Sequence, residues 1–348
     1  MASVPPTGPE SIVLTSFGGI KNTVSEERLG QGDLASAVNV DLDDVGQLRR
    51  RRGYTRVSTA MCHSLMTLGD VTLVVKDGVL GRLYPDYSFK PLSPVGPTAL
   101  CYVRVADTIF YSSASGVSGK ITNDEHAPWG EFGAGMWVSP VLRPTETLGA
   151  IRGKLLTGPP AATCMDAYKG RIYLGHERLI WATELYLYDK VDAEKNFIQT
   201  EADVTMIAAV DKGLFIGTTA ALHFLQGTLA DGLKMRTVIN SPVIPGSLAI
   251  VPYAKALPQA RQGPVPEGYG PMFMTAGGVL VGLDNGDAFN LTQDRVVFPG
   301  VVRAAALYRE DQGANAYVAV TDSAGGPSAN ARIGDYVDAE IVRASQRG

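Results

Sequence analysis

The chain has 348 residues, of which 45% are hydrophobic and 19% are charged, and its formal net charge at neutral pH is −4. These values are typical of a soluble globular protein with a filled core, and the overall charge does not favour a polyanionic partner. No apolar run approaches the roughly 20 residues of a membrane-spanning helix, so we expect no membrane insertion by this chain.

The first 57 residues differ in character from the rest. Residues 1–10 contain three prolines and predict a flexible arm, without the basic and apolar pattern of a secretory signal. Residues 11–57 predict an N-terminal extension with a short apolar strand, a glycine pair and a run of arginines. That run is Arg49, Arg50, Arg51 and Arg52. In a strand, alternate arginines point to opposite faces.

The arginine run has two interpretations. The cations can contact acidic neighbouring subunits, or transiently contact DNA phosphates along a channel. Alternatively they belong to a solvated edge strand, whose charges discourage unwanted sheet pairing. The sequence alone does not separate these interpretations.

Short strands recur from residue 58 to residue 345. The clearest copies are Cys62–Tyr84, Ala99–Lys120, Ala162–Tyr188, Val204–Gln226, Met272–Leu291 and Ala304–Val320. In each, we expect the middle strand to be a core strand, for example Gly213–Ile216. Alternating or continuous apolar runs of four to six residues bounded by Gly, Asp and Asn are strand and hairpin signals. Units that repeat every roughly 40–50 residues are typical of propeller blades. The predicted fold is therefore all-β, a β-propeller of about six blades (five to seven) with an N-terminal extension.

Turn residues and blade-core residues support the same fold. Asp284–Asp287 contains the Asn-Gly pair of a two-residue hairpin, and Asp77-Gly78 and Lys169-Gly170 predict similar turns. Asp335–Arg343, or failing that Ser11–Leu14, is the candidate for the strand that closes the ring. The residues expected to have structural roles in the blade cores are Gly170, Tyr173, Trp181, Gly213, Phe215 and Gly217.

Two insertions interrupt the repeats, at about residues 123–160 and 252–269. The first carries Trp129, Trp137 and His126, which we name as candidate interface residues. Long loops on a rigid β-scaffold often bind partners, but the interpretation that these two loops only connect strands is equally well supported. The three cysteines are odd in number and widely spaced, so we expect buried free thiols and folding in a reducing cytoplasm.

No constellation of catalytic or metal-binding residues is visible. The four histidines lack metal-ligand spacing, and neither a nucleophile elbow nor a phosphate-binding loop is present. Propellers can be glycosidases that use paired carboxylates, for which Glu177, Glu184, Asp189 and Asp192 are the nearest candidates. We expect these to be surface charges, and we predict no catalytic residue, no metal, no cofactor and no enzymatic activity.

Two stretches together resemble a known family. The first contains Phe17-Gly18-Gly19-Ile20-Lys21-Asn22, then Ala37-Val38-Asn39-Val40-Asp41, then Gly46-Gln47-Leu48 and the arginine run ending in Gly53-Tyr54. The second runs from Gly158-Pro159-Pro160 through Tyr168–Tyr173 to Phe224–Gly227. Both are similar to tail nozzle and hub proteins of short-tailed bacteriophages and to related tail-tip proteins.

The resemblance implies a structural protein of the virion tail, assembled in the bacterial host cytoplasm. It implies a ring of identical subunits, which we expect to be a hexamer, around the channel that holds and delivers the genome. Other tail or adaptor proteins and transiently contacted DNA would be its partners. The matched positions Asn39 and Asp41, with the four arginines, become candidate interface or channel residues.

Two other functions remain open. A propeller that binds or depolymerises host-surface carbohydrate is suggested by Trp129, Phe132 and Trp137, because flat aromatic rings stack on sugars. A cellular scaffold propeller is the other alternative.

Overall fold

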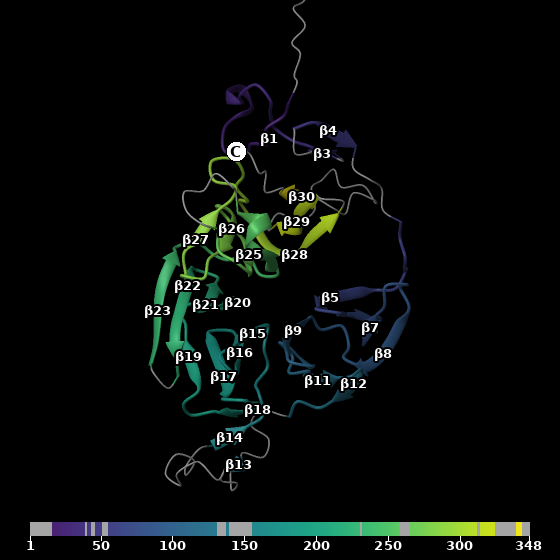
Figure 1. The fold of residues 1–348 in the computed structure, drawn as a ribbon, viewed down its shortest axis with the longest axis vertical. Helices are drawn as coiled ribbons and strands as arrows, with labels where there is room; N and C mark the ends of the chain where they lie inside the picture. The colour runs from purple at the N-terminus through teal and green to yellow at the C-terminus, as the bar shows by residue number, and fades with distance from the viewer. Residues whose placement is uncertain are drawn as a thin grey trace, which may run out of the picture.

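The structure is a computed structural model, and the residues that it describes are 16–38, 40–42, 46–50, 55–130, 137–138, 155–229, 232–257, 265–311, 314–323 and 339–342. It confirms the predicted fold class: the protein is almost entirely β, with five blades arranged as a β-propeller (Figure 1). Five lies within the expected range of five to seven blades. A further three-stranded sheet follows blade five in the ring.

Blades one and two are four-stranded antiparallel sheets, with the strands in sequence order from the ring centre outward. The strands of blade one are β5 (Cys62–Leu68), β6 (Val71–Lys76), β7 (Val79–Leu83) and β8 (Phe89–Pro94). The strands of blade two are β9 (Leu100–Val105), β10 (Thr108–Ser113), β11 (Gly119–Thr122) and β12 (Glu125–Ala127). β12 thus takes part of the first predicted insertion into a blade.

Blade three is extended by two short strands from the same insertion. Its strands are β15 (Cys164–Tyr168), β16 (Arg171–His176), β17 (Leu179–Glu184), β18 (Leu187–Asp192) and β19 (Phe197–Gln199). β13 (Trp137–Val138) and β14 (Leu155–Thr157) continue the sheet beyond β18. Both β18 and β19 pair with β17, and a register shift in β17 separates β18 from the rest of the blade.

Blades four and five are again four-stranded. Blade four contains β20 (Val204–Val210), β21 (Gly213–Thr218), β22 (Leu222–Thr228) and β23 (Gly232–Ile239). Blade five contains β24 (Ala249–Pro252), β25 (Tyr269–Thr275), β26 (Gly278–Gly282) and β27 (Ala288–Asn290). The one-turn helix α2 (Tyr253–Ala256) follows β24, inside the second predicted insertion.

The C-terminal sheet consists of β28 (Val301–Asp311), β29 (Ala314–Ser323) and β30 (Ala339–Val342). We predicted that Asp335–Arg343 would close the ring by joining a blade at the other end of the chain. Instead β30 pairs with β29 of its own sheet. Pairing with the neighbouring strand β29 closes a short loop, whereas pairing with blade one would close a loop of nearly the whole chain. The entropic cost of loop closure grows with loop length, so the local pairing is favoured. Residues 11–14, the second candidate, lie outside the described residues.

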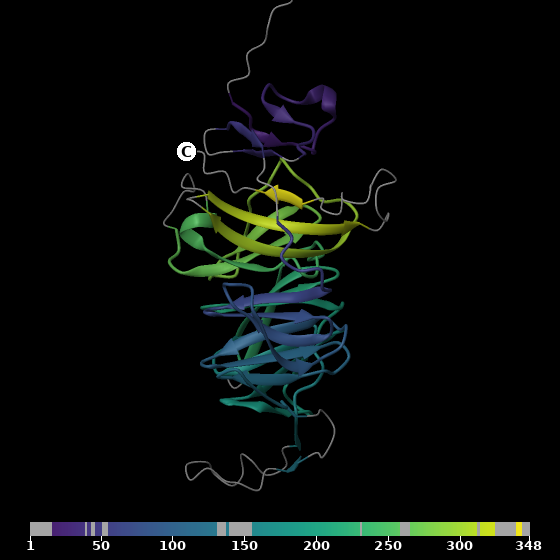
Figure 2. The same cartoon turned by 90° about the vertical axis from the view of Figure 1, so that its right-hand side faces the viewer.

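The N-terminal extension contains two small strand pairs. β1 (Gly19–Ile20) pairs in parallel with β2 (Asp33–Leu34), and a 3₁₀ helix (Glu26–Arg28) lies between them. β3 (Val40–Leu42) pairs with β4 (Leu48–Arg50) in antiparallel register. Figure 2 shows this extension in purple beside the C-terminal sheet in yellow.

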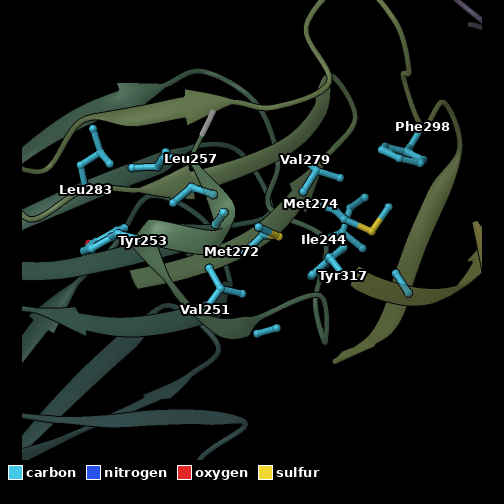
Figure 3. Close-up of a cluster of buried hydrophobic side chains, with 14 residues drawn as sticks. Ile244, Val251, Tyr253, Leu257, Met272, Met274, Val279, Leu283, Phe298 and Tyr317 are labelled. Carbon is cyan, nitrogen blue, oxygen red and sulfur yellow. The ribbon is translucent and has the colours of Figure 1, made fainter. Parts of the chain in front are cut away.

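Hydrophobic clusters between neighbouring blades hold the ring together, because each blade is apolar on both faces. Separate clusters join blades one and two, two and three, three and four, and four and five. A fifth cluster joins blade five to the C-terminal sheet through Tyr317 and Ala319 of β29 (Figure 3). The middle strands that we predicted to be cores, such as Gly213–Ile216, contribute fully buried residues.

Two predicted hairpin turns have the expected geometry, and one differs. Asp77-Gly78 and Lys169-Gly170 each occupy the left-handed region at both central positions, as a two-residue hairpin turn requires. In the β26–β27 turn only Gly286 has a positive φ, of 85°. Asn285 instead accepts the backbone N–H of Asp287 through its side chain, at 3.1 Å. That local hydrogen bond stabilises a longer turn, so the predicted two-residue hairpin is wrong here.

Candidate functional site

Residues Gly18–Thr23 anchor the N-terminal extension to the loop that follows the last strand of blade five. The side chain of Asn22 donates to the carbonyl of Val297 and accepts the N–H of Val297, both at 2.8 Å. The N–H of Asn22 donates to the carbonyl of Arg295 at 2.9 Å, and the Thr23 hydroxyl donates to the carbonyl of Asp294 at 2.8 Å. We call this set of contacts, between Gly18–Thr23 and Asp294–Val297, the N-terminal clasp.

Charge pairing strengthens the N-terminal clasp. Arg295 donates to the carbonyl of Gly18 at 2.7 Å and to the carboxylate of Asp33 at 2.9 Å. Lys21 lies 3.7 Å from the same carboxylate. Because Asp33 is mostly buried while both cations are partly exposed, one carboxylate links the two strands of the extension to the blade-five loop.

The β3–β4 pair carries the part of the arginine run that the structure describes. Arg49 and Arg50 are exposed on β4. Arg49 stands opposite Asp41 in the strand register, and Arg50 stands opposite Val40. The two arginines point to opposite faces, as expected for neighbours in a strand. Asn39, Arg51 and Arg52 lie outside the described residues.

Among the candidate interface residues of the first insertion, Trp129 is buried and His126 is exposed. Trp129 is only 1% exposed, its ring lies 4.9 Å from that of Phe110, and its indole N–H donates to the carbonyl of Tyr188 at 2.9 Å. Trp129 therefore fills the junction of blades two and three and offers no ring face to a partner. Trp137 lies in β13, opposite Leu156 of β14.

His126 is exposed on β12 beside a surface hollow of about 660 Å³. Its Nε2 lies 2.8 Å from the hydroxyl of buried Tyr111. Burial lowers the pKa of His126 and raises the pKa of Tyr111, so both groups are neutral near pH 7. Ser93 and Pro159 line the hollow from the neighbouring blades, and none of the described residues that line it is a carboxylate. The hollow offers hydrogen bonds to a neutral polar ligand.

The predicted blade-core residues lie in the blades. Gly170 occupies the β15–β16 turn with φ of 75°, and Tyr173 is 2% exposed. The partly buried ring of Trp181 lies 5.3 Å from that of Phe197. Phe215 is fully buried. A Cβ on Gly213 would meet Phe224 at 2.5 Å, and one on Gly217 would meet Val243 at 2.8 Å. Neither position therefore has room for a side chain larger than that of glycine.

Two of the acidic candidates of blade three, Glu184 and Asp192, have hydrogen-bond partners within the blade. Glu184 accepts a hydrogen bond from Asn196 at 3.0 Å and lies 3.9 Å from Arg171. Asp192 is 1% exposed and accepts the backbone N–H of Glu194. These carboxylates are used in turns and ion pairs, where they already have partners.

One polar cluster was missed by the sequence interpretation. His223 is 5% exposed, and its Nε2 lies 2.6 Å from the carboxylate of Glu201 while its Nδ1 lies 3.2 Å from the hydroxyl of Thr237. Glu201 also accepts from Thr218 at 3.2 Å. The cluster joins the loop before β20 to β22 and β23. The partners are up to 36 residues apart in sequence and share no spacing motif. Predicting that they meet would have required knowledge of how the strands of blade four pair.

The described residues contain no group of three or more His, Cys, Asp or Glu side chains that could hold a metal ion. No helix in this part of the chain is long and apolar enough to cross a membrane.

No family model and no curated protein matches the chain. Solved structures with a similar arrangement include the extracellular domain of BT4673 from B. thetaiotaomicron, with 11% identity and a TM-score of 0.46. That match covers 77% of this chain but only 32% of the other, so the chain spans about a third of its length. The computationally designed Ika8 protein has 10% identity, coverage of 76% and 69%, and a TM-score of 0.41. The N-terminal domain of Nup159 has 8% identity, coverage of 74% and 72%, and a TM-score of 0.42.

Proposed function

We propose that the chain is a non-enzymatic structural protein of a bacteriophage tail, acting as a nozzle, hub or tail-tip component. In this proposal identical subunits form a ring around the DNA channel and help to hold and deliver the genome. The observation that carries the proposal is the N-terminal clasp. The motif Gly18–Asn22, which resembles the opening of phage tail proteins, is the segment that fixes the extension to the last blade.

The clasp gives the extension a mechanical role. A segment held by several hydrogen bonds and one shared carboxylate presents its outer strands in a fixed orientation. The exposed Arg49 and Arg50 of β4 then face a neighbouring tail protein or the channel from a rigid support. Cations displayed in this way suit acidic protein surfaces or brief phosphate contacts.

The site chemistry supports assembly rather than catalysis. His126, His223 and Glu184 are engaged in hydrogen bonds with neighbouring side chains. Binding of host carbohydrate stays as the alternative proposal, but the buried ring of Trp129 is not available for stacking on a sugar.

Mass spectrometry of purified virions tests the proposal directly. The protein should be present in stoichiometric amounts, in a multiple of the ring symmetry, and a phage with an amber codon in its gene should assemble particles that fail at the tail. Arg50→Ala should reduce infectivity while leaving the isolated protein folded. Complete particles without the protein would exclude the proposed function.

A further inference from the structure

Blade one has a small hollow at one end, with a volume of about 240 Å³. It lies where the β5–β6 turn meets the β7–β8 turn, because alternate turns of an antiparallel sheet lie at the same end. Pockets for drug-sized ligands have about 300–1,000 Å³, so this hollow suits a single small ring. The residues that line it include Asp70, Thr72, Arg82, Tyr84, Pro85 and Tyr87. We call it the blade-one hollow.

Tyr87 borders the blade-one hollow from a rigid turn. Its φ is 63°, in the left-handed region, and it is 62% exposed. The N–H of Tyr87 donates to the carbonyl of Tyr84 at 2.9 Å, and the hydroxyl of Ser88 donates to Asp86 at 2.7 Å within the same turn. Because the turn is already fixed, little ordering of the backbone is needed for a ligand to bind against Tyr87.

The charged groups of the hollow are already paired within the protein. The carboxylate of Asp70 accepts a hydrogen bond from Arg104 at 2.8 Å, and Arg82 donates to Asp124 at 2.8 Å. A ligand with a net charge would have to compete with one of these ion pairs for its partner. The balance of charge therefore favours a neutral ligand.

Both charged groups at the hollow keep capacity for further hydrogen bonds. The side chain of Asp70 is 75% exposed, and a carboxylate can accept several hydrogen bonds. Arg82 donates to Asp124 and, at 3.4 Å, to the backbone carbonyl of Asp70, and a guanidinium has further N–H groups. A ligand with adjacent hydroxyl groups can donate to the carboxylate and accept from the guanidinium at the same time.

Apolar surface lies beside these polar groups. Tyr87 and Pro85 are both exposed and both line the hollow. A sugar in its pyranose form has C–H groups on its faces and hydroxyl groups around its edge. It can therefore lie against an aromatic ring while its hydroxyl groups reach Asp70 and Arg82. A flexible polyol lacks such a face, and an apolar ring lacks the hydroxyl groups.

We propose that the blade-one hollow binds one pyranose ring of a neutral glycan. Tyr87 is the surface on which the sugar ring stacks, and Asp70 and Arg82 hold two adjacent hydroxyl groups. This site lies in a different blade contact from the buried Trp129, and it adds a ligand to the assembly role proposed above. The inference does not depend on that role.

Saturation-transfer NMR on the full chain tests the site. The probes are the methyl glycosides of glucose, galactose, mannose, N-acetylglucosamine and rhamnose. At least one should bind with a Kd on the order of 1 mM, as expected for a ligand of this size. Its C–H protons should receive more saturation on one face of the ring than on the other. If none of the probes binds, the neutral-glycan site is excluded.

Variants locate the binding. Tyr87→Ala should weaken the best probe about tenfold, whereas Tyr87→Phe keeps the ring and should stay within about threefold of the natural chain. Tyr186→Ala is the matched control, because Tyr186 is 67% exposed and has φ of 56° in the β17–β18 turn of blade three. It should bind like the natural chain. Unchanged binding by Tyr87→Ala, or an equal loss in both alanine variants, would overturn the site.

Two further probes test the class of ligand. Glucuronic acid should bind more weakly than methyl glucoside, because its carboxylate would compete with Asp70 for cations. Glycerol should bind at least tenfold more weakly, because it has no ring face to stack on Tyr87. Tighter binding of either probe would overturn the assignment of a neutral pyranose. These results are separate from the proposed tail function, which depends on whether the protein is present in virions.

Discussion

The carboxylate of Asp166, on the innermost strand of blade three, accepts the backbone N–H of Ala209 on the innermost strand of blade four, at 2.7 Å. Its other oxygen accepts the N–H of Ala167, also at 2.7 Å. Short side chains make similar links at earlier junctions, where Ser64 accepts from Leu100 N–H and Ser112 accepts from Ala162 N–H. The blades are thus joined near the ring axis by hydrogen bonds as well as by apolar cores.

Removing the Asp166 carboxylate should destabilise the ring. Asp166→Ala leaves the N–H groups of Ala167 and Ala209 without their acceptors, which typically costs about 1–3 kcal/mol in free energy of unfolding. Asp166→Asn keeps one acceptor oxygen and should cost less. Urea denaturation measures both values. Equal stability of the alanine variant and the natural chain would show that this link contributes nothing.

The same residue predicts a pH dependence. Burial raises the pKa of Asp166, although the N–H groups of Ala209 and Ala167 oppose that rise. The folded state therefore holds its proton to higher pH than the unfolded state does. The stability that this group contributes is complete below its ordinary value of about 3.9 and falls as the pH rises above it. The natural chain should lose stability relative to Asp166→Asn between about pH 4 and the raised pKa.

Asp124 should show the opposite pH dependence. It accepts a hydrogen bond from Arg82 at 2.8 Å and lies 3.4 Å from Lys90, so it ties blade two to blade one. The hydrogen bond from Arg82 is the main reason that the pKa of Asp124 is lowered. Its contribution is present above about pH 4 and is lost as the pH falls through the lowered pKa. Because the pair is near the surface, Asp124→Asn should cost only about 1 kcal/mol or less at pH 7.

The two carboxylates can be compared in one experiment. Stability differences from the natural chain, measured from pH 3 to pH 7, should change in opposite directions for Asp166→Asn and Asp124→Asn. A common direction for both would contradict the assigned causes, burial for Asp166 and ion pairing for Asp124.

Phe215 is central to the junction of blades four and five. It is fully buried, and its ring lies 5.1 Å from that of Phe224 and 6.4 Å from that of Phe273. Phe215→Ala should lower the free energy of unfolding by about 3–5 kcal/mol, because it leaves a cavity in a packed core. Phe215→Leu should cost less. Phe197→Ala is the control, since Phe197 is 42% exposed, and a similar loss there would argue against a cavity effect.

Much of the fold could be predicted from the sequence because blade strands are local signals. An apolar run such as Ile172–Leu174, which follows a turn with glycine, predicts a buried hairpin strand without knowledge of its neighbours, and β16 contains it. The turn at Lys169-Gly170 was predictable for the same reason. The β26–β27 turn was not, because the side chain of Asn285 competes for the backbone N–H of Asp287.

The contacts between distant segments could not be predicted in this way. Asn22 and Val297 are 275 residues apart, and nothing in either local sequence identifies the partner. The burial of Trp129 depends likewise on Phe110 and Tyr188 from two blades. In a glycine- and proline-rich loop, the local sequence does not distinguish an exposed aromatic residue from a buried one. We therefore expected Trp129 at the surface, whereas the structure places it in the core.

Gly170 should be needed for its backbone conformation. Its φ of 75° lies in the left-handed region, where a side chain with a Cβ costs about 1–2 kcal/mol. Gly170→Ala should lose at least that amount in thermal or urea unfolding, because the added Cβ would also meet the exposed ring of Tyr186 at 2.7 Å. Gly170→Asn makes the same contact but should lose less of the conformational part, because asparagine tolerates this region. Gly277→Ala is the matched control. Gly277 has no such φ, and its Cβ would meet only Thr275, at 3.9 Å. An equal loss at both positions would contradict a conformational cause.

The N-terminal clasp should control the opening of the extension without affecting the blades. Asn22→Ala removes two hydrogen bonds to Val297, each contributing about 1 kcal/mol. Backbone amides of the extension, including that of Lys21, which donates to the carbonyl of Leu34, should then exchange with solvent more than tenfold faster. Amides of β21 in blade four should keep their natural rates. Asn285→Ala is the control of identical chemistry, because the side chain of Asn285 bonds only within its own turn. If exchange in the extension is unchanged in Asn22→Ala, the clasp does not hold it, and the mechanical role proposed for the tail-like motif fails with it.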